Sequence, residues 1–380
     1  MKYQLVPKTG WNVSKLSFGC MRFRDEETAA EAVRKAIELG VNYFDVAPGY
    51  GGGAAEPFLG KGIRGLRDKA IITAKSSPGN GGDGLSDYNP KAGFGIRTAD
   101  EARREIDQSM EFLGVDHLDM YQFWALHSDV IFDEGVKPGG FMEGVMKARD
   151  EGLFDYIGMT THSESDHIIR YLKNSPYEFD MVTLPFHPRN AGRGKAIDYC
   201  AERGIGVVAM NPLAGGMLGR PAAVFQKVAD DLGLDSMVEA SLRFVAGFDN
   251  ITTALNGITL AEHAIQGAAA IEKGPLTGDV AGKFVERLDE VLQNVPAGRM
   301  CTGCGYCGEC PEGIAIPELL GLYTDLLIPS MADAARAKIA EHAAGHDPST
   351  CTACKQCEEK CPNGIPVSEM MAEAAKTWNK

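Results

Sequence analysis

Residues 28–47 read TAAEAVRKAIELGVNYFDVA, and this stretch contains one complete helix-to-strand unit. Over 28–39 the apolar residues recur at helical spacing and form one stripe. The stripe consists of Ala32, Val33, Ala36, Ile37 and Leu39. Gly40 then provides a helix stop, and the apolar run 43–47 (YFDVA) has the composition of a buried strand. Such a unit is typical of α/β folds with a parallel sheet.

The same alternation continues along most of the chain and predicts the fold class. Strands are expected at 16–20, 43–47, 70–75, 117–124, 154–161, 181–187, 206–213 and 251–257. Helices are expected between them at 28–39, 98–113, 141–151, 165–173, 194–203 and 236–246. Eight strands alternating with helices favour a (β/α)8 TIM barrel over an open sheet. Residues 3–13 are expected to form a short hairpin across the barrel bottom.

Size and charge narrow the possible functions. At 380 residues and 40.8 kDa the chain can hold a large barrel and a small second domain. It carries 38 Lys and Arg against 52 Asp and Glu, a net charge of −14, which argues against a nucleic-acid partner. No apolar run reaches the ~18 residues of a membrane span, and the start MKYQLVPKTG lacks the apolar core of a signal peptide. We therefore expect a cytoplasmic protein with no membrane partner.

Two long connections interrupt the alternation, at 76–97 and at 126–140. Long structureless loops in a compact domain are usually functional or disordered. Both follow predicted strands, so they belong to the barrel face that carries active sites, although a tolerated surface insertion is the alternative. The glycine-rich connection 76–97 is expected to be a flexible cover. Its GNGGDG at 79–84 matches a dinucleotide fingerprint by letters only, because no helix is expected to follow directly.

The cysteines mark a second domain. Eight of the ten fall within 301–361, whereas Cys20 and Cys200 stand alone and are expected to pack as small apolar side chains. The sequence thus predicts a barrel over 1–296 and a mostly helical, ferredoxin-like domain over 297–380. Helical patterns at 317–327 and 331–344 lie between its two cysteine motifs.

These motifs read CTGCGYCGECP at 301–311 and CTACKQCEEKCP at 351–362. In two-cluster ferredoxins, three cysteines spaced by two bind one [4Fe–4S] cluster and the fourth reaches the other cluster. This rule predicts one ligand set of Cys301, Cys304, Cys307 and Cys361. It predicts a second set of Cys351, Cys354, Cys357 and Cys310. Zinc is the alternative, but the third cysteine at the same spacing is surplus to a tetrahedral site, and disulfides would require export.

A second candidate site lies at the ends of the second and third predicted strands, where Asp45, Tyr50 and Lys75 occur. A free phenol has a pKa of about 10, too high for ready proton transfer at neutral pH. A nearby ammonium lowers that pKa, and a carboxylate can orient the ammonium. The three residues therefore predict a general acid, Tyr50, that Lys75 and Asp45 activate.

Together these motifs resemble the aldo/keto reductase family, and in particular its iron–sulfur subgroup with a C-terminal ferredoxin-like module. The resemblance rests on FDVAPGYG at 44–51 with Glu56 following, the Lys75 strand end, NPLAGG at 211–216, LNGIT at 255–259, and CTGCGYC at 301–307. It implies an NAD(P)H-dependent barrel with a Tyr–Lys–Asp–His tetrad, of which Tyr50, Lys75 and Asp45 match the first three members.

The histidine of this tetrad has two interpretations. The family's fourth strand commonly runs Tyr-x-x-His, but here Tyr121-Gln122-Phe123 is followed by Trp124. His127 comes three residues later, and it either enters the site through a bulge or is an ordinary loop residue. His162, after the fifth strand, is another ring that could approach the substrate.

The resemblance also implies contacts to the cofactor. Thr160 and Thr161 match the nicotinamide contacts. Asn211, Pro212, Leu213 and Gly215 match the stretch against the pyrophosphate, and Gly257, Thr259, Glu262 and His263 match the adenosine end. The chain departs from the family at Leu184-Pro185, where a Gln usually faces the nicotinamide. It also lacks the Lys and Arg that hold a 2′-phosphate in 257–267, which leaves NADP preference open.

Three functions are compatible with these features. The first is an oxidoreductase that interconverts a small carbonyl compound and an alcohol with NAD(P)H, while two [4Fe–4S] clusters transfer electrons. A hydride carries two electrons and a cluster one, so this function requires a redox partner protein or purely structural clusters. The second is an electron-transfer or assembly subunit with an inactive barrel. The third is a lyase or isomerase that uses Tyr50 and Lys75 for acid–base chemistry.

Overall fold

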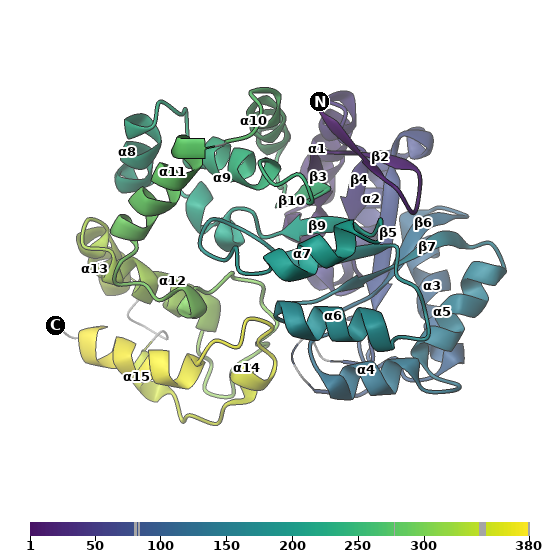
Figure 1. The fold of residues 1–380 in the computed structure, drawn as a ribbon. Helices are drawn as coiled ribbons and strands as arrows, with labels where there is room; N and C mark the ends of the chain where they lie inside the picture. The colour runs from purple at the N-terminus through teal and green to yellow at the C-terminus, as the bar shows by residue number, and fades with distance from the viewer. Residues whose placement is uncertain (80–81, 83, 277, 342–346, 379–380) are drawn as a thin grey trace.

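The computed structural model describes residues 1–79, 82, 84–276, 278–341 and 347–378. Its central feature is a closed parallel barrel in the order β10-β3-β4-β5-β6-β7-β8-β9 (Figure 1). The strands are β3 (Leu16–Gly19), β4 (Tyr43–Asp45), β5 (Ile71–Ser76), β6 (Leu118–Phe123), β7 (Phe154–Thr160), β8 (Met181–Pro185), β9 (Gly206–Met210) and β10 (Thr253–Gly257). Each predicted strand is confirmed, and β10 closes the barrel by pairing with both β9 and β3.

Helices surround the barrel, as the apolar stripes predict. They are α1 (Glu26–Glu38), α2 (Ala55–Ile63), α3 (Ala99–Leu113), α4 (Asp129–Val136), α5 (Phe141–Asp150), α6 (Ser165–Asn174), α7 (Gly194–Ala201), α8 (Ala223–Asp231), α9 (Met237–Ala246), α10 (Ala261–Glu272) and α11 (Gly278–Val291). In α1 the Asp25 side chain caps the first turn by accepting from the Thr28 amide. The predicted stripe is buried except for Leu39, which follows the helix and is partly buried. Gly40 follows with a φ of +87°, a conformation that favours glycine.

The N-terminal hairpin closes one end of the barrel, as predicted. It consists of β1 (Tyr3–Val6) and β2 (Trp11–Ser14), which pair antiparallel. Val6 and Val13 are fully buried among apolar side chains that point down from the barrel strands. The Tyr156 hydroxyl also donates to the Thr9 carbonyl at 3.0 Å. An open pocket can therefore exist only at the opposite end, where the strands have their carboxyl ends.

The prediction of a structureless connection over 126–140 is wrong, because this segment contains helix α4. The Ser128 side chain caps it by accepting from the Ile131 amide, and both Ile131 and Phe132 are buried. Gly135 approaches so closely that a Cβ there would lie 2.3 Å from the Phe123 ring. The helix thus depends on packing against the barrel.

The connection 76–97 packs beside the end of the barrel where the strands have their carboxyl ends. The Ser77 amide donates to Gly93 at 2.9 Å, and the Phe94 ring stacks on Trp124 with a centroid distance of 4.3 Å. A Cβ on Gly49 would lie 2.9 Å from the Ala92 carbonyl oxygen, so the connection also supports the turn that carries Tyr50. Its role as a flexible cover stays a prediction, and half of the GNGGDG match, residues 80, 81 and 83, lies outside the described residues.

The C-terminal tail is mostly helical and has its own core. Its helices are α12 (Ile316–Leu327), α13 (Ala332–Glu341), α14 (Gln356–Glu359) and α15 (Val367–Trp378). Leu319, Leu320, Met370 and Met371 pack together in this core, with six of the motif cysteines against it. The domain boundary after residue 296 stays a prediction. In the described part of the chain, no helix has both the length and the apolar character needed to cross a membrane.

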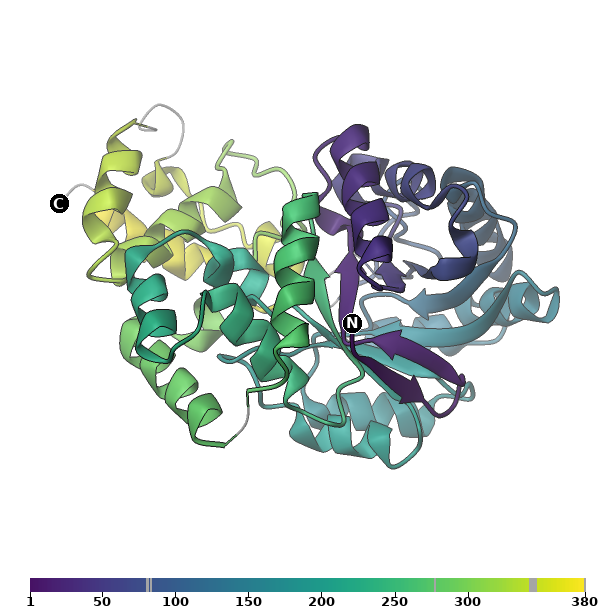
Figure 2. The ribbon, with the colours of Figure 1, turned by 90° about the horizontal axis from the view of Figure 1, so that it is seen from above.

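The tail lies on the side of the barrel away from the N-terminal hairpin (Figures 1 and 2). Arg220, which follows β9, binds both carboxylate oxygens of Asp325 in α12 at 2.8 and 2.9 Å. Both contacts are made by one guanidinium nitrogen, Nη1, in a partly buried ion pair that links the barrel to the tail. The tail therefore covers the end of the barrel where the strands have their carboxyl ends.

Two glycine-to-alanine substitutions within helices should have opposite effects on stability. In α2, a Cβ on Gly60 would lie 2.4 Å from the Leu113 carbonyl oxygen, whereas in α11 nothing lies within 4 Å of a Cβ on exposed Gly282. We expect Gly60→Ala to lower the free energy of unfolding by about 1–3 kcal/mol through overpacking. Gly282→Ala should raise it by up to about 1 kcal/mol through helix propensity. Urea unfolding followed by circular dichroism measures both, and an unchanged midpoint for Gly60→Ala would contradict the close approach of α2 and α3.

Candidate active site

Asp45, Tyr50 and Lys75 come together at the open end of the barrel, as predicted. Asp45 ends β4 and pairs in register with Thr73 of β5, so Lys75, two residues further on, points to the same side. The Lys75 ammonium forms an ion pair with Asp45, and each residue is only 2% exposed. The Lys75 nitrogen lies 4.8 Å from the centroid of the Tyr50 ring. The predicted contact of all three side chains is therefore present.

A polar network that the sequence analysis missed holds Asp45 in place. The Gln122 side-chain amide donates to Asp45 Oδ2 at 2.8 Å, and the Thr73 hydroxyl donates to the same oxygen at 3.2 Å. Thr183 in turn donates to Gln122 Oε1 at 3.0 Å. All of these residues are buried inside the barrel. The sequence did carry a sign of this network, because polar residues stand at inward-facing positions of strands that are otherwise apolar.

The expectation that Lys75 lowers the pKa of Tyr50 is wrong. Burial and the neighbouring Asp45 carboxylate raise the pKa of Tyr50 well above its ordinary value, and only a hydrogen bond from Tyr306 opposes them. The physical reason is that the charge of Lys75 is paired with Asp45 and leaves little net positive field at the phenol. Tyr50 therefore keeps its proton at neutral pH and can act as a donor.

His127 lies in the pocket, which decides between its two interpretations. Ala125 adopts a φ of +54° directly after β6 and turns the chain so that His127 lines the cavity with Tyr50. Its Nδ1 accepts from the His162 amide at 3.0 Å, so the ring proton belongs on Nε2. Burial holds the pKa of His127 well below its ordinary value, so the ring is neutral. His162 lines the same cavity and contacts the tail through Asn363 at 2.9 Å.

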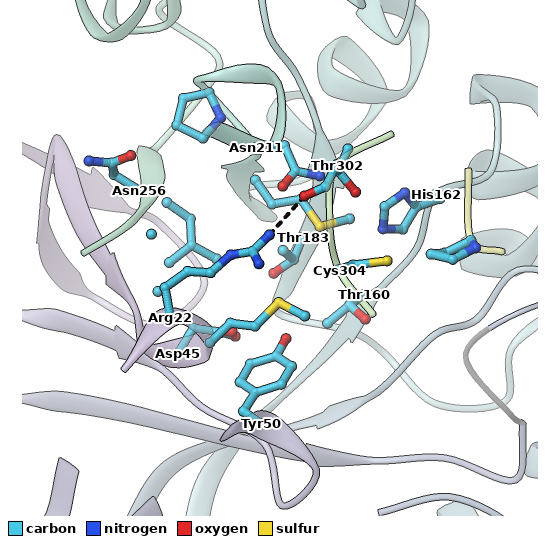
Figure 3. Close-up of a pocket in the computed structure, with 18 of the residues that line it drawn as sticks. Arg22, Asp45, Tyr50, Thr160, His162, Thr183, Asn211, Asn256, Thr302 and Cys304 are labelled. Atoms are coloured by element: carbon cyan, nitrogen blue, oxygen red, sulfur yellow. Dashed lines mark hydrogen bonds between the residues drawn. The ribbon is translucent and has the colours of Figure 1, made fainter. Parts of the chain in front are cut away.

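The cavity at this site has a volume of about 170 Å³. This is smaller than the roughly 300–1,000 Å³ of most ligand pockets and suits a small substrate. Its floor is formed by the barrel residues described above, with Trp124 as a wall. Figure 3 shows Tyr50 and Cys304 pointing into the same space. The pocket is therefore shared between the barrel and the tail.

The contribution of the tail was not predicted. Thr302, Cys304, Tyr306 and Pro362 all line the cavity. Tyr306 lies between the second and third cysteines of its motif, and its ring contacts Trp124 at a centroid distance of 5.9 Å. It also hydrogen-bonds the Tyr50 hydroxyl. Nothing in the spacing of the motif distinguishes this tyrosine from a spacer residue, so no sequence signal could have revealed its role.

The structure brings several cysteines of the two motifs to one small cavity, but among the described residues no group of Cys, His, Asp or Glu side chains is already placed as a closed metal site. Cys301, Cys304, Cys307 and Cys361, the first ligand set that the spacing predicts, line one cavity together with Cys357 of the second set. Gly303 and Gly305 have φ of +61° and +81°, and their counterparts Ala353 and Lys355 have φ of +54° and +62°. The two motifs thus share a backbone turn that non-glycine residues rarely adopt. Thiol donors in such paired turns fit [4Fe–4S] clusters, although the assignment of each ligand stays a prediction.

The predicted dinucleotide contacts are only partly brought together. Thr160, Asn211, Pro212, Leu213, Gly215 and Gly257 line the cavity. Thr161, Thr259, Glu262 and His263 are not part of its lining. The Thr161 hydroxyl instead accepts from the Ser163 amide at 3.0 Å, and the Thr259 amide donates to His263 at 3.3 Å. A cofactor role for these residues stays a prediction. Cys20 and Cys200 are fully buried, as predicted.

Comparisons with known proteins agree with this architecture. Residues 15–290 match the family described as aldo/keto reductase, and residues 300–365 match the 4Fe-4S dicluster domain. L-galactose dehydrogenase of Arabidopsis thaliana is 30% identical over 57% of this chain and 67% of its own length. An uncharacterized oxidoreductase of Schizosaccharomyces pombe is 24% identical over 72% of this chain and 86% of its own length.

Solved structures show the same fold. A holo aldo-keto reductase from Bacillus halodurans superposes with a TM-score of 0.62 at 24% identity, over 76% of this chain and 96% of that one. The region of the family match contains the barrel with Asp45, Tyr50 and Lys75. The chain therefore belongs to the aldo/keto reductase family and carries a 4Fe-4S dicluster domain at its C-terminal end.

Proposed function

We propose that this oxidoreductase interconverts a small carbonyl compound and its alcohol in the pocket of Asp45, Tyr50 and Lys75, with the clusters of the tail as its electron carriers. The observation that carries the proposal is the shared pocket, in which Tyr50 of the barrel and Cys304 of the tail line one cavity. Cys304 also lines the cavity of the first cysteine set, so a cluster ligand borders the substrate site.

Tyr50 supplies the proton in this proposal. Its raised pKa keeps the hydroxyl protonated until the substrate oxygen gains negative charge, and the proton then passes to that oxygen. The Lys75 ammonium beneath the ring stabilises the phenolate that remains, while Asp45 holds Lys75 in position. The neutral His127 ring can donate from Nε2 to the same oxygen and orient the substrate.

The electron source distinguishes this proposal from the alternatives. Reduction of the carbonyl consumes two electrons and two protons. A bound [4Fe–4S] cluster would exchange one electron at a time, so a reduced redox partner protein would have to deliver two electrons in succession. Tyr50 would supply the proton on the oxygen, and the proton that joins the carbon would come from water. A lyase or isomerase would use Tyr50 and Lys75 but gives no reason for Cys304 to border the pocket. An inactive barrel would not need the fully partnered Asp45–Lys75 pair.

The family resemblance also implies NAD(P)H, but Gly215 is covered by Thr302: a Cβ on Gly215 would lie 2.3 Å from the Thr302 Cα. A dinucleotide does not fit here while the tail is seated, and no step is assigned to it.

Replacing Tyr50 tests the proposed proton transfer. We expect Tyr50→Phe to lower carbonyl reduction at least ~100-fold, the scale of general acid catalysis, while the fold is retained. The assay uses anaerobic holoprotein, a reduced viologen as electron source and a panel of small aldehydes and ketones. Tyr156→Phe is the matched control, because Tyr156 bonds the Thr9 carbonyl at the closed end of the barrel. Equal rates for Tyr50→Phe and wild type would place the acid elsewhere.

Tyr306 is expected to act as a positioning residue through Tyr50. Tyr306→Phe removes the hydrogen bond to the Tyr50 hydroxyl and should slow turnover about fivefold, the equivalent of one neutral hydrogen bond. The same change in a Tyr50→Phe background should have no further effect, because the acceptor is gone. A double-mutant cycle of kcat measures this coupling. Additive losses would show that Tyr306 acts only through packing.

Metal analysis tests the cluster assignment. We expect about eight irons per chain in anaerobically prepared protein, and about four in Cys361→Ser. Cys361 belongs to the second motif but lines the cavity of the first cysteine set, so its loss should remove the cluster beside the pocket. Cys200→Ala is the control, since Cys200 is buried in the barrel. Iron analysis with electron paramagnetic resonance provides the readout, and zinc in place of iron would contradict the assignment.

A further inference from the structure

A groove at the open end of the barrel is filled by the tail. Its walls are Arg22, directly after β3, and the turn that follows β9. The Arg22 guanidinium donates to the carbonyl oxygen of Thr302 at 2.8 Å (Figure 3). It also donates to the carbonyl oxygen of Gly303 at 2.7 Å. On the other wall, the Gly215 backbone lies directly against the Thr302 backbone. The segment Thr302–Gly303 is therefore clamped from both sides.

The walls of this groove have the chemistry of an anion site. An arginine guanidinium is the side chain best suited to phosphate oxygens, because it offers paired donors in a fixed fork. The opposite turn contains Gly215 and Gly216 with φ of +70° and +99°, and Asn211 and Ala214 also have positive φ. Such strained turns cluster at ligand sites. In this structure the donors of the Arg22 guanidinium are taken up by two carbonyl oxygens of the tail.

Further contacts keep the segment in the groove. The Asn363 side-chain amide donates to the Thr302 hydroxyl at 3.2 Å, and Asn363 also pairs with His162 of the barrel at 2.9 Å. The ion pair of Arg220 with Asp325 in α12 also anchors the tail. A ligand that needs the groove must therefore displace several polar contacts at once.

We propose that the segment Thr302–Gly303 takes the place of a dinucleotide pyrophosphate, so that the docked tail and a nicotinamide dinucleotide exclude each other. This inference rests on the proposed function in one respect, namely that the reaction takes place in the pocket next to the groove. In the docked form, nicotinamide cannot be the immediate reductant. Dinucleotide binding requires the segment to leave the groove.

Binding measurements on anaerobic holoprotein test this exclusion. NADH and NADPH are each titrated calorimetrically up to about 1 mM, the upper end of usual Michaelis constants. Hydrogen exchange of the amides in 300–307 reports whether the segment stays docked. The loosened variant is Arg220→Ala/Asn363→Ala, which leaves Arg22 and the groove turn intact, and its iron content confirms that the clusters are present. Arg170→Ala is the control, since Arg170 pairs with Asp129 on the barrel surface.

We expect neither dinucleotide to bind to wild type or to Arg170→Ala. The loosened variant should bind with a dissociation constant at least tenfold below the highest concentration titrated. Its amides in 300–307 should also exchange faster than those of wild type. Binding to wild type accompanied by faster exchange of this segment would equally support exclusion. Binding to wild type with exchange unchanged would overturn it. So would a loosened variant that exchanges faster but binds neither dinucleotide.

These outcomes are independent of the proposed function. The Tyr50→Phe comparison measures turnover with a viologen donor, which needs no dinucleotide. If Tyr50→Phe loses turnover, and the dinucleotide binds while the tail segment stays docked, the proposed function is upheld and the exclusion is rejected. Unchanged turnover together with exclusion would do the reverse.

Discussion

The buried ion pair between Lys75 and Asp45 is the interaction on which the rest of the pocket depends. Removing two charges from water costs several kcal/mol per ion unless close pairing and further hydrogen bonds offset it. Here Gln122 and Thr73 complete the partners of Asp45. Those partners come from neighbouring parallel strands, so the pair requires both the closed barrel and its register. The proposed role of Tyr50 as proton donor depends on this arrangement, because its ring packs over the Lys75 ammonium, which Asp45 holds in place.

Much of this could be predicted because it is encoded locally. Strands and helices follow from the period of apolar residues, and Asp45 and Lys75 follow from their position at strand ends. Helix α4 was missed because its signal, a Ser128 cap before Ile131 and Phe132, lies in a segment rich in loop-forming residues. The pKa of Tyr50 was predicted in the wrong direction because burial and charge pairing depend on the packed structure and not on the presence of a lysine.

The docking of the tail could not be predicted for a different reason. Arg22 contacts Thr302 and Gly303 through their backbone carbonyls, across 280 residues of sequence. Any residue can present a carbonyl oxygen, so side-chain identity carries no signal. Tyr306 is similar, since its cysteine motif predicts a cluster turn but not what the turn rests against. The spacing of cysteines therefore indicates the cofactor, whereas its position relative to the barrel emerges only in three dimensions.

The position of the tail links cofactor assembly to formation of the pocket. A ligand that binds the folded state but not the unfolded state contributes its binding energy to folding, and metal sites are strong examples. The turn that carries Cys301–Cys307 contains left-handed glycines and is held against the barrel by Arg22, so cysteine ligation would add a second constraint once clusters bind. Because Cys304 and Tyr306 form one wall of the pocket, the substrate site is complete only when that turn is ordered. In the function proposed above, cluster loading would therefore complete the shape of the site as well as supply its electrons.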